Sequence, residues 1–191
     1  MTEQDKSKVQ TCIDSVVARF RRSPNVYLTE DDVRIHLCRE LLRHFDQELT
    51  TQDIDRSIEL HTEVRWYGDG SLKLRSDIVI IEVSTLEVRR HIRMPSKDYG
   101  FNIPKGIIEL KFRRPNGSSD NKWESDIKAD IQKLEKLMPI FGAASPQTQT
   151  EFWVVALDKK TMIDPPESQG GVHLTYGYSN QCEPDGGEER R

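Results

Sequence analysis

The sequence predicts an α/β protein, a three-layer α/β/α sandwich with a central mixed sheet. Two segments with helical periodicity come first, and three strand candidates follow them in the middle of the chain. A third helical segment then separates those strands from two further strand candidates. Helices that flank and interrupt runs of strands are typical of a mixed sheet covered by helices.

Composition indicates one soluble domain. The chain has 191 residues, of which 35% are hydrophobic and 31% charged, and its net charge is -4; this length suits a single core. No apolar run is long enough to span a membrane, and the three widely spaced cysteines favour neither a zinc site nor a disulfide framework. We expect a cytoplasmic protein with one domain over residues 1–179, beginning with an N-terminal helix. Residues 180–191 lack apolar periodicity and are expected to form a mobile tail.

The three helices have recognisable starts and ends. The first is expected over residues 4–20, and the second begins after Thr29, an N-cap residue with Asp32 three positions later. The third covers residues 122–138, and Pro139 is expected to end it. Its apolar stripe consists of Trp123, Ile127, Ile131, Leu134, Leu137 and Met138, with Asp130 inside the stripe in an expected structural role.

A carboxylate falls on the apolar side of the second helix. At 100° per residue, Glu30 lies beneath Leu37 and Leu41, whereas Glu40 falls at the edge of the stripe. Glu30 therefore either stabilises the helix dipole from the first turn or points into a functional cleft. Glu40 is the alternative carboxylate for the second role.

Three strand candidates form the middle of the chain, at residues 58–67, 71–83 and 106–112. Residues 67–70 (Tyr-Gly-Asp-Gly) provide the turn of a hairpin between the first two. Polar residues 46–57 are expected to form a linker. Alternation along the first strand puts Leu60, Thr62, Val64 and Trp66 on one face and Glu59, His61, Glu63 and Arg65 on the other. The second set lies either on a solvated face or near the mouth of a site.

Charged residues interrupt two of these apolar strands. Glu109 and Lys111 share one face of the third strand, while Leu110 points to the other face. Burying a carboxylate and an ammonium on an apolar strand is costly unless they have partners. The pattern therefore indicates a metal-ion site, to which Asp77 on the neighbouring strand contributes a second carboxylate.

Asp77, followed after 31 residues by Glu109-Leu110-Lys111 and then by a helix, resembles the PD-(D/E)XK nuclease superfamily. The resemblance covers roughly residues 28–158, and Ser76 stands in place of the proline in the family name. It implies a restriction-endonuclease-like fold and a metal-dependent endonuclease that hydrolyses phosphodiester bonds in DNA. The implied cofactor is Mg²⁺, with Mn²⁺ as a substitute.

The resemblance also implies residue roles. Asp77, Glu109 and the carbonyl of Leu110 would hold the metal. Lys111 would orient or deprotonate a water, or stabilise the transition state, and Glu30 would act through a water or a second metal. The helix after the motif often lends polar residues to the site or to DNA, and here these are Lys128, Gln132 and Lys133.

Clustered basic residues are the expected contacts to nucleic acid, in spite of the acidic net charge. They lie in the long connection 84–105 and at the end of the third strand, and comprise Arg89, Arg90, Arg93, Arg113 and Arg114. A basic connection beside a metal cleft would bind the phosphate backbone, or it is only a solvated loop. The expected partner is DNA, with RNA left open and no membrane. A homodimer or a partner protein in restriction or antiphage defence would fit a single nuclease domain.

Two other interpretations stay open. The chain is a non-catalytic nucleic-acid-binding or interaction module that keeps the nuclease fold, although intact Asp77, Glu109 and Lys111 argue against decay. Alternatively, the motif is accidental, and Glu109 and Lys111 form a surface ion pair in an unrelated α/β protein.

Overall fold

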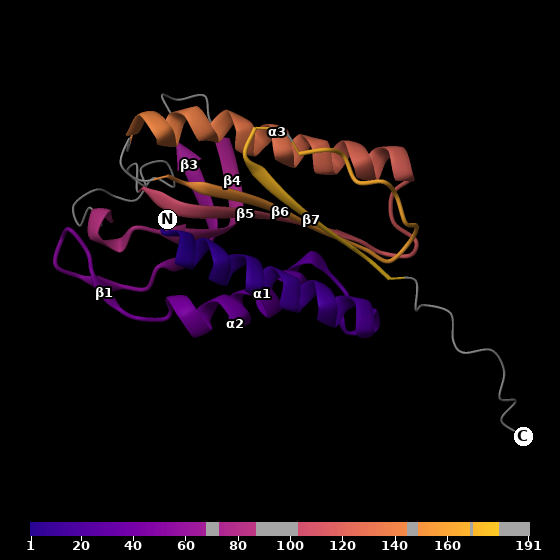
Figure 1. Cartoon of the computed structure of the whole chain (residues 1–191), viewed down its shortest axis with the longest axis horizontal. Helices are drawn as coiled ribbons and strands as arrows, with labels where there is room; N and C mark the ends of the chain where they lie inside the picture. The colour runs from indigo at the N-terminus through magenta and orange to yellow at the C-terminus, as the bar shows by residue number, and fades with distance from the viewer. Residues whose placement is uncertain (68–72, 87–102, 145–148, 169, 180–191) are drawn as a thin grey trace, which may run out of the picture.

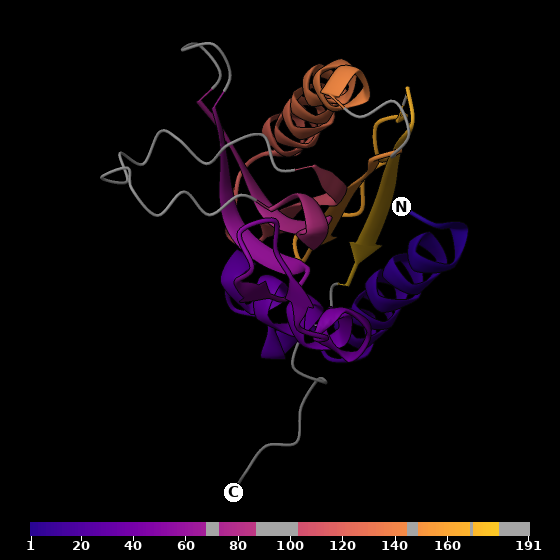
Figure 2. The ribbon, with the colours of Figure 1, turned by 90° about the vertical axis from the view of Figure 1, so that its left-hand side faces the viewer.

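A computed structural model describes residues 1–67, 73–86, 103–144, 149–168 and 170–179. It confirms the α/β class: three α-helices pack against a five-stranded mixed sheet. Both ribbon views place α3 on one face of the sheet and α1 and α2 on the other (Figures 1 and 2). The helices are α1 (Glu3–Arg22), α2 (Glu30–Phe45) and α3 (Asp120–Ala144), with short 3₁₀ turns η1 (Pro24–Val26) and η2 (Val83–Thr85).

The sheet has the strand order β3-β4-β5-β6-β7. Pairing is antiparallel from β3 to β5 and parallel from β5 to β7, so β5 lies at the centre where the direction changes. The strands are β3 (Leu60–Tyr67), β4 (Lys73–Ile81), β5 (Pro104–Arg113), β6 (Glu151–Asp158) and β7 (Val172–Tyr178). The predicted linker contains a separate two-stranded ribbon instead, formed by β1 (Leu49–Thr50) and β2 (Arg56–Ser57).

Two apolar clusters hold the layers together. The first lies between the sheet and α1 and α2, and includes Ile108 and Leu110 of β5. The second lies between the sheet and α3, and includes Ile107 of the same strand. Because side chains alternate along β5, Glu109 and Lys111 follow Ile107 onto the α3 face. The predicted separation of Glu109 and Lys111 from Leu110 is thereby confirmed.

The start of α2 matches the prediction. The Thr29 hydroxyl accepts a hydrogen bond from the Asp32 amide, and the Asp32 carboxylate accepts one from the Thr29 amide in return. This capping box fixes where the helix begins. Glu30 is therefore its first residue, and Arg34 lies one turn later on the same side of the helix.

The expectation that Pro139 ends the third helix is wrong. Helix α3 continues through Pro139 to Ala144. Proline removes one hydrogen bond of a helix and crowds the preceding turn, which normally costs about 3 kcal/mol. The last turn is retained by packing, since Phe141 is buried and its ring lies 4.9 Å from that of Trp66.

The predicted alternation of β3 does not hold from one end of the strand to the other. Leu60 packs in the α1 and α2 cluster, whereas Trp66 packs in the α3 cluster, although they are an even number of residues apart. The change occurs at Glu63, whose φ of 57° is in the left-handed region. Such a residue breaks the period of two on which the prediction relied.

The remaining sequence expectations lie partly outside the described residues. No described helix is long and apolar enough to cross a membrane. Cys12 and Cys38 are free thiols. The hairpin turn at 68–70, most of the basic connection and residues 180–191 fall outside the ranges given above.

Candidate active site

The site lies where β4 and β5 separate. Their antiparallel pairing ends at Ile78 and Ile108, while β4 stays paired with β3 and β5 with β6. Just beyond that point, the Asp77 carboxylate accepts a hydrogen bond of 2.8 Å from the Leu110 amide. The Asp77 side chain thus takes the place of a strand partner, and the gap between the strands opens beside Glu109 and Lys111.

The same hydrogen bond orients the Leu110 carbonyl. In an antiparallel pair, the N–H and C=O of one residue point toward the same neighbouring strand. Because the Leu110 amide points to Asp77, its carbonyl also faces the gap between β4 and β5. The expected metal ligands Asp77, Glu109 and Leu110 are thereby brought to one place.

Glu109 is a buried carboxyl group, with 1% of the residue exposed. One oxygen pairs with the Lys133 ammonium of α3, which also donates a 3.0 Å hydrogen bond to the Arg75 carbonyl. The other oxygen, Oε1, is buried and has no hydrogen-bond partner among the described residues. Burial raises the pKa of Glu109 to about 8, although the nearby Lys133 acts in the opposite direction.

Lys111 pairs with Asp130, which the sequence placed on the apolar stripe of α3. The Lys111 Nζ lies 3.0 Å from Asp130 Oδ2. Burial acts to lower the pKa of Lys111, but Asp130, Glu30 and Asp77 outweigh it, so this pKa is raised. The group is therefore held as an ammonium ion, and Asp130 has a partner at the site rather than elsewhere in the core.

Arg34 is a site residue that sequence reasoning missed. Its guanidinium lies 3.0 Å from Asp77 and 2.7 Å from Glu63, and Arg75 lies 2.7 Å from the other oxygen of Glu63. Arg34 therefore neutralises Asp77, and Glu63 is oriented by two arginines at its strained position. The available signal was the spacing of four residues from Glu30, which puts both side chains on one side of α2.

The two candidate carboxylates of α2 lie in different places. Burial raises the pKa of Glu30, and the charges acting on it include Lys111, Asp77 and Arg34, so Glu30 is close to the site. Glu40 instead pairs with Arg43 on its own helix. The structure thus brings Glu30, and not Glu40, together with the motif residues.

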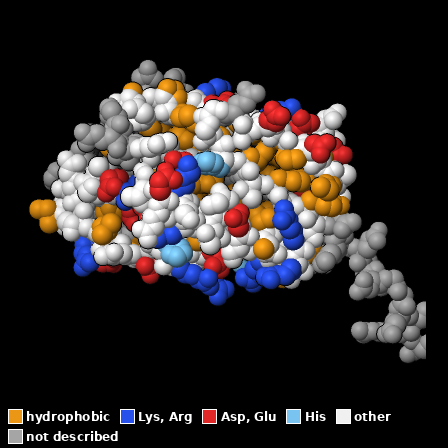
Figure 3. Space-filling model, viewed as in Figure 1, with side chains coloured by type: hydrophobic (Ala, Val, Ile, Leu, Met, Phe, Trp, Pro, Cys, Tyr) orange, Lys and Arg blue, Asp and Glu red, His pale blue; other side chains and the backbone are white. Residues whose placement is uncertain are grey.

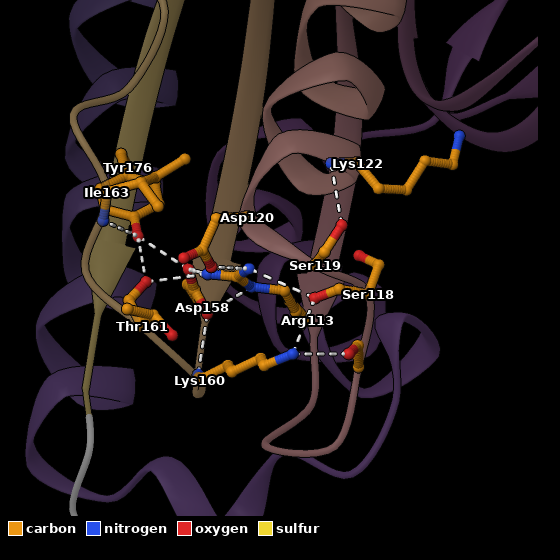
Figure 4. A network of polar contacts seen from close by, with 11 residues as sticks. Arg113, Ser118, Ser119, Asp120, Lys122, Asp158, Lys160, Thr161, Ile163 and Tyr176 are labelled. Atoms are coloured by element: carbon orange, nitrogen blue, oxygen red, sulfur yellow. Dashed lines mark hydrogen bonds and ion pairs between the residues drawn. The ribbon is translucent and has the colours of Figure 1, made fainter.

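The arginines expected to contact nucleic acid differ in their exposure. Arg113 is 2% exposed, and its guanidinium binds Asp158, Asp120 and the Thr161 carbonyl (Figure 4). A buried guanidinium with these partners has no free donor for a phosphate, so the expectation for Arg113 is replaced by a structural role. Arg114 is exposed, whereas Arg89, Arg90 and Arg93 lie outside the described residues.

The site is charge-compensated in this arrangement. The carboxylates of Asp77, Glu109 and Asp130 face Arg34, Lys133 and Lys111 respectively. Among the residues that the structure describes, no three His, Cys, Asp or Glu side chains are grouped to hold a metal ion. Even so, two carboxylates and a carbonyl are the hard oxygen donors that Mg²⁺ prefers, and the unpartnered Glu109 Oε1 is a buried acceptor. The donor chemistry fits the ion, provided that the paired cations move.

Comparison of the chain with protein-family models, curated proteins and solved structures gave no match.

Proposed function

We propose that the protein is a metal-dependent endonuclease of the PD-(D/E)XK type that hydrolyses phosphodiester bonds in DNA. The observation that carries the proposal is the position of buried Glu109 beside Asp77 and Lys111 where two central strands separate. Nothing in folding requires these charges there, since an apolar residue would cost less to bury. The helices on both faces of the sheet agree with the three-layer, restriction-endonuclease-like sandwich that this function implies.

Three oxygen donors would hold the Mg²⁺ ion: the carboxylates of Asp77 and Glu109 and the carbonyl of Leu110. A bound Mg²⁺ supplies charge neutralisation for a phosphate and a lower pKa for a coordinated water. Arg34 and Lys133 are counter-ions for the two carboxylates in the metal-free protein. If a bound metal ion took over that neutralising role, Arg34 and Lys133 would be free to bind the non-bridging oxygens of a phosphate.

Lys111 is proposed to act as a charged group. A general base at neutral pH needs a lowered lysine pKa, whereas Asp130 and its neighbours raise that of Lys111. Its ammonium would therefore stabilise negative charge on the phosphate rather than remove a proton from water. Glu30, close enough to Lys111 and Asp77 for their charges to act on it, would accept a proton from water, since burial raises its pKa above the ordinary value.

A non-catalytic nucleic-acid-binding or interaction module is the second candidate. The observation that favours it is the charge compensation itself, because Asp77, Glu109 and Asp130 already have a cationic partner each. The accidental-motif interpretation is weaker, since Glu109 is buried and its partner is Lys133 rather than Lys111. A role in restriction or antiphage defence, in the cytoplasm, is an extension of the first candidate by analogy.

A cleavage assay separates the two candidates. Duplex DNA, single-stranded DNA and RNA would each be incubated with the protein in Mg²⁺, Mn²⁺ or chelator. We expect metal-dependent cleavage of DNA that Lys111→Ala reduces at least a hundredfold. Lys136→Ala, which removes an exposed cation from the same helix as Lys133, is the matched control. Binding of nucleic acid without cleavage in either metal would favour the non-catalytic module.

A further inference from the structure

A pocket of about 450 Å³ opens beside the candidate site. It lies between the end of β5 and the first turns of α3, and Lys111, Arg114, Ser118 and Trp123 line it. Lys111 belongs both to this pocket and to the charged cluster around Asp77. A ligand in the pocket would therefore lie directly beside the phosphate that is proposed to bind at the site.

The charges that line the pocket favour an anion. Of the three lining cations, Lys111 is paired with Asp130 and Arg113 with Asp158, which leaves Arg114 as the cation that can bind a ligand. The one lining carboxylate, Asp126, is paired with Lys122 at 2.6 Å. The exposed Arg114 side chain forms no ion pair with any residue that the structure describes. Arginine presents several donors in a fixed plane, a geometry that suits a phosphate group. Within the described part of the chain, no carboxylate competes with a ligand for this guanidinium.

The wall of the pocket is held in place by polar contacts, of which the Arg113–Asp158 pair is buried and those of Lys160 are exposed. Figure 4 shows Arg113, Asp158 and Lys160 converging on the loop that leads into α3. Lys160 Nζ donates to the carbonyls of Gly117 and Ser118 at 3.0 and 3.1 Å. A side chain at Gly117 would meet Arg113 Cγ and the Arg114 carbonyl at 2.9 Å, so the loop can approach this closely only as glycine. The pocket is therefore preformed, which reduces the entropic cost of binding.

We infer that this pocket binds one nucleotide of the nucleic-acid chain, next to the phosphate that lies at the site, with its own phosphate on Arg114. The inference rests on the proposed function. The volume of the pocket is within the range that suits a small organic ligand and exceeds what a bare phosphate needs. A base-paired nucleotide cannot enter without leaving the stack, at a cost of a few kcal/mol that is least for unpaired bases. The substrate is then DNA that is single-stranded, or unpaired, at the cleavage position.

The test measures binding in chelator, so that it does not depend on cleavage. The probes are thymidine 5′-monophosphate, thymidine and inorganic phosphate. NMR detects the binding of each through the amide signals of Gly117 and Ser118. We expect the nucleotide to shift these signals at concentrations at which thymidine and inorganic phosphate do not. Arg114→Ala should weaken nucleotide binding about tenfold. Arg114→Lys should restore part of the affinity. Lys136→Ala, about 20 Å further along α3 from Trp123, should leave it unchanged.

A second arm identifies the source of the nucleotide. A short single-stranded oligonucleotide should displace thymidine 5′-monophosphate, and a blunt duplex should not. Equal binding by wild type and Arg114→Ala, equal binding of inorganic phosphate and nucleotide, or failure of the oligonucleotide to compete would each overturn the inference. Nucleotide binding without cleavage would leave the pocket standing while the proposed function fails. Cleavage without nucleotide binding would support the proposed function and overturn the nucleotide pocket.

Discussion

Glu109 is the residue whose environment is hardest to explain by folding alone. Its pKa of about 8 is above the ordinary value of 4.5, mainly because burial disfavours the charged form. Between these two values the unfolded chain binds fewer protons than the folded protein. The free energy of unfolding of the metal-free protein should therefore fall as pH rises through this window, by up to about 1.4 kcal/mol per pH unit.

The variant Glu109→Gln isolates this effect. Because glutamine does not titrate, we expect its stability relative to wild type to improve steadily from pH 5 to pH 8, as measured by urea denaturation in chelator. Glu167→Gln, at an exposed loop position, should show no such trend. Parallel stability curves for wild type and Glu109→Gln would contradict the burial argument.

Arg34 leads to a prediction about metal affinity. Its guanidinium occupies Asp77 Oδ1 at 3.0 Å, so a metal ion has to displace a positive charge from that carboxylate. Arg34→Gln should therefore tighten Mn²⁺ binding in the absence of DNA by about tenfold. The matched control is Arg39→Gln, an exposed arginine on the same helix, which should not change the affinity. Calorimetry measures both, and equal or weaker Mn²⁺ binding by Arg34→Gln would show that Arg34 does not compete for Asp77.

At the site, alternation along one strand was enough to predict the face of Glu109 and Lys111. The helical wheel likewise placed Glu30, and not Glu40, near them. Lys133 was one of the three helix residues that the resemblance implied, whereas Arg34 was missed and Asp130 was expected to be structural. Which carboxylate each cation pairs with could not be predicted, because Arg34, Asp130 and Lys133 reach the site across layers from two different helices. Such contacts depend on how far apart the layers lie, which a one-dimensional pattern does not contain.

At the scale of elements, the buried pair of Arg113 and Asp158 connects the ends of β5 and β6. Arg113 Nε and Nη2 bind the two oxygens of Asp158 at 2.9 and 2.5 Å, and Tyr176 of β7 donates to Asp158 at 2.8 Å (Figure 4). Arg113→Ala leaves a buried carboxylate unpaired, which should cost about 3–5 kcal/mol of unfolding free energy. Thermal or urea denaturation measures this loss.

The adjacent arginine provides the control for that prediction. Arg114 is exposed, so Arg114→Ala should change stability by no more than about 0.5 kcal/mol. The double variant Arg113→Met with Asp158→Leu should recover part of the loss, because neither partner is then left as a buried charge. If Arg113→Ala and Arg114→Ala are equally stable, the buried pair does not hold the strand ends together.

The elements themselves were predictable wherever local signals agreed with the tertiary structure. The capping box at Thr29 and the apolar stripe of the third helix both have local causes, and both predictions are confirmed. The errors at Pro139 and Glu63 have tertiary causes. Packing of Phe141 against Trp66 retains a helical turn that proline disfavours, and the two arginines around Glu63 accompany a backbone conformation that glutamate rarely adopts.

For the whole molecule, the question is how an acidic chain would bind an acidic polymer. The net charge is -4, and on the face shown in Figure 3 acidic and basic side chains are interspersed. Compensation within the site removes one obstacle, since Arg34, Lys111 and Lys133 already offset carboxylates that would otherwise repel phosphate. Affinity for DNA must then come from a limited number of local phosphate contacts.

Salt dependence counts those contacts. Each phosphate contact that is lost should lower the slope of log K against log salt by about 0.9 for duplex DNA and about 0.7 for single strands. We expect Arg114→Ala to remove one contact, and neutralisation of Arg89, Arg90 and Arg93 together to remove up to three, measured by fluorescence anisotropy in chelator. Because these residues are not metal ligands, Mn²⁺ affinity should stay unchanged in both variants. An unchanged slope in the triple variant would mean that the basic connection is only solvated and that DNA follows another path. An unchanged slope in Arg114→Ala would remove the phosphate contact at the pocket, because a guanidinium that binds phosphate has to displace counter-ions from the polymer.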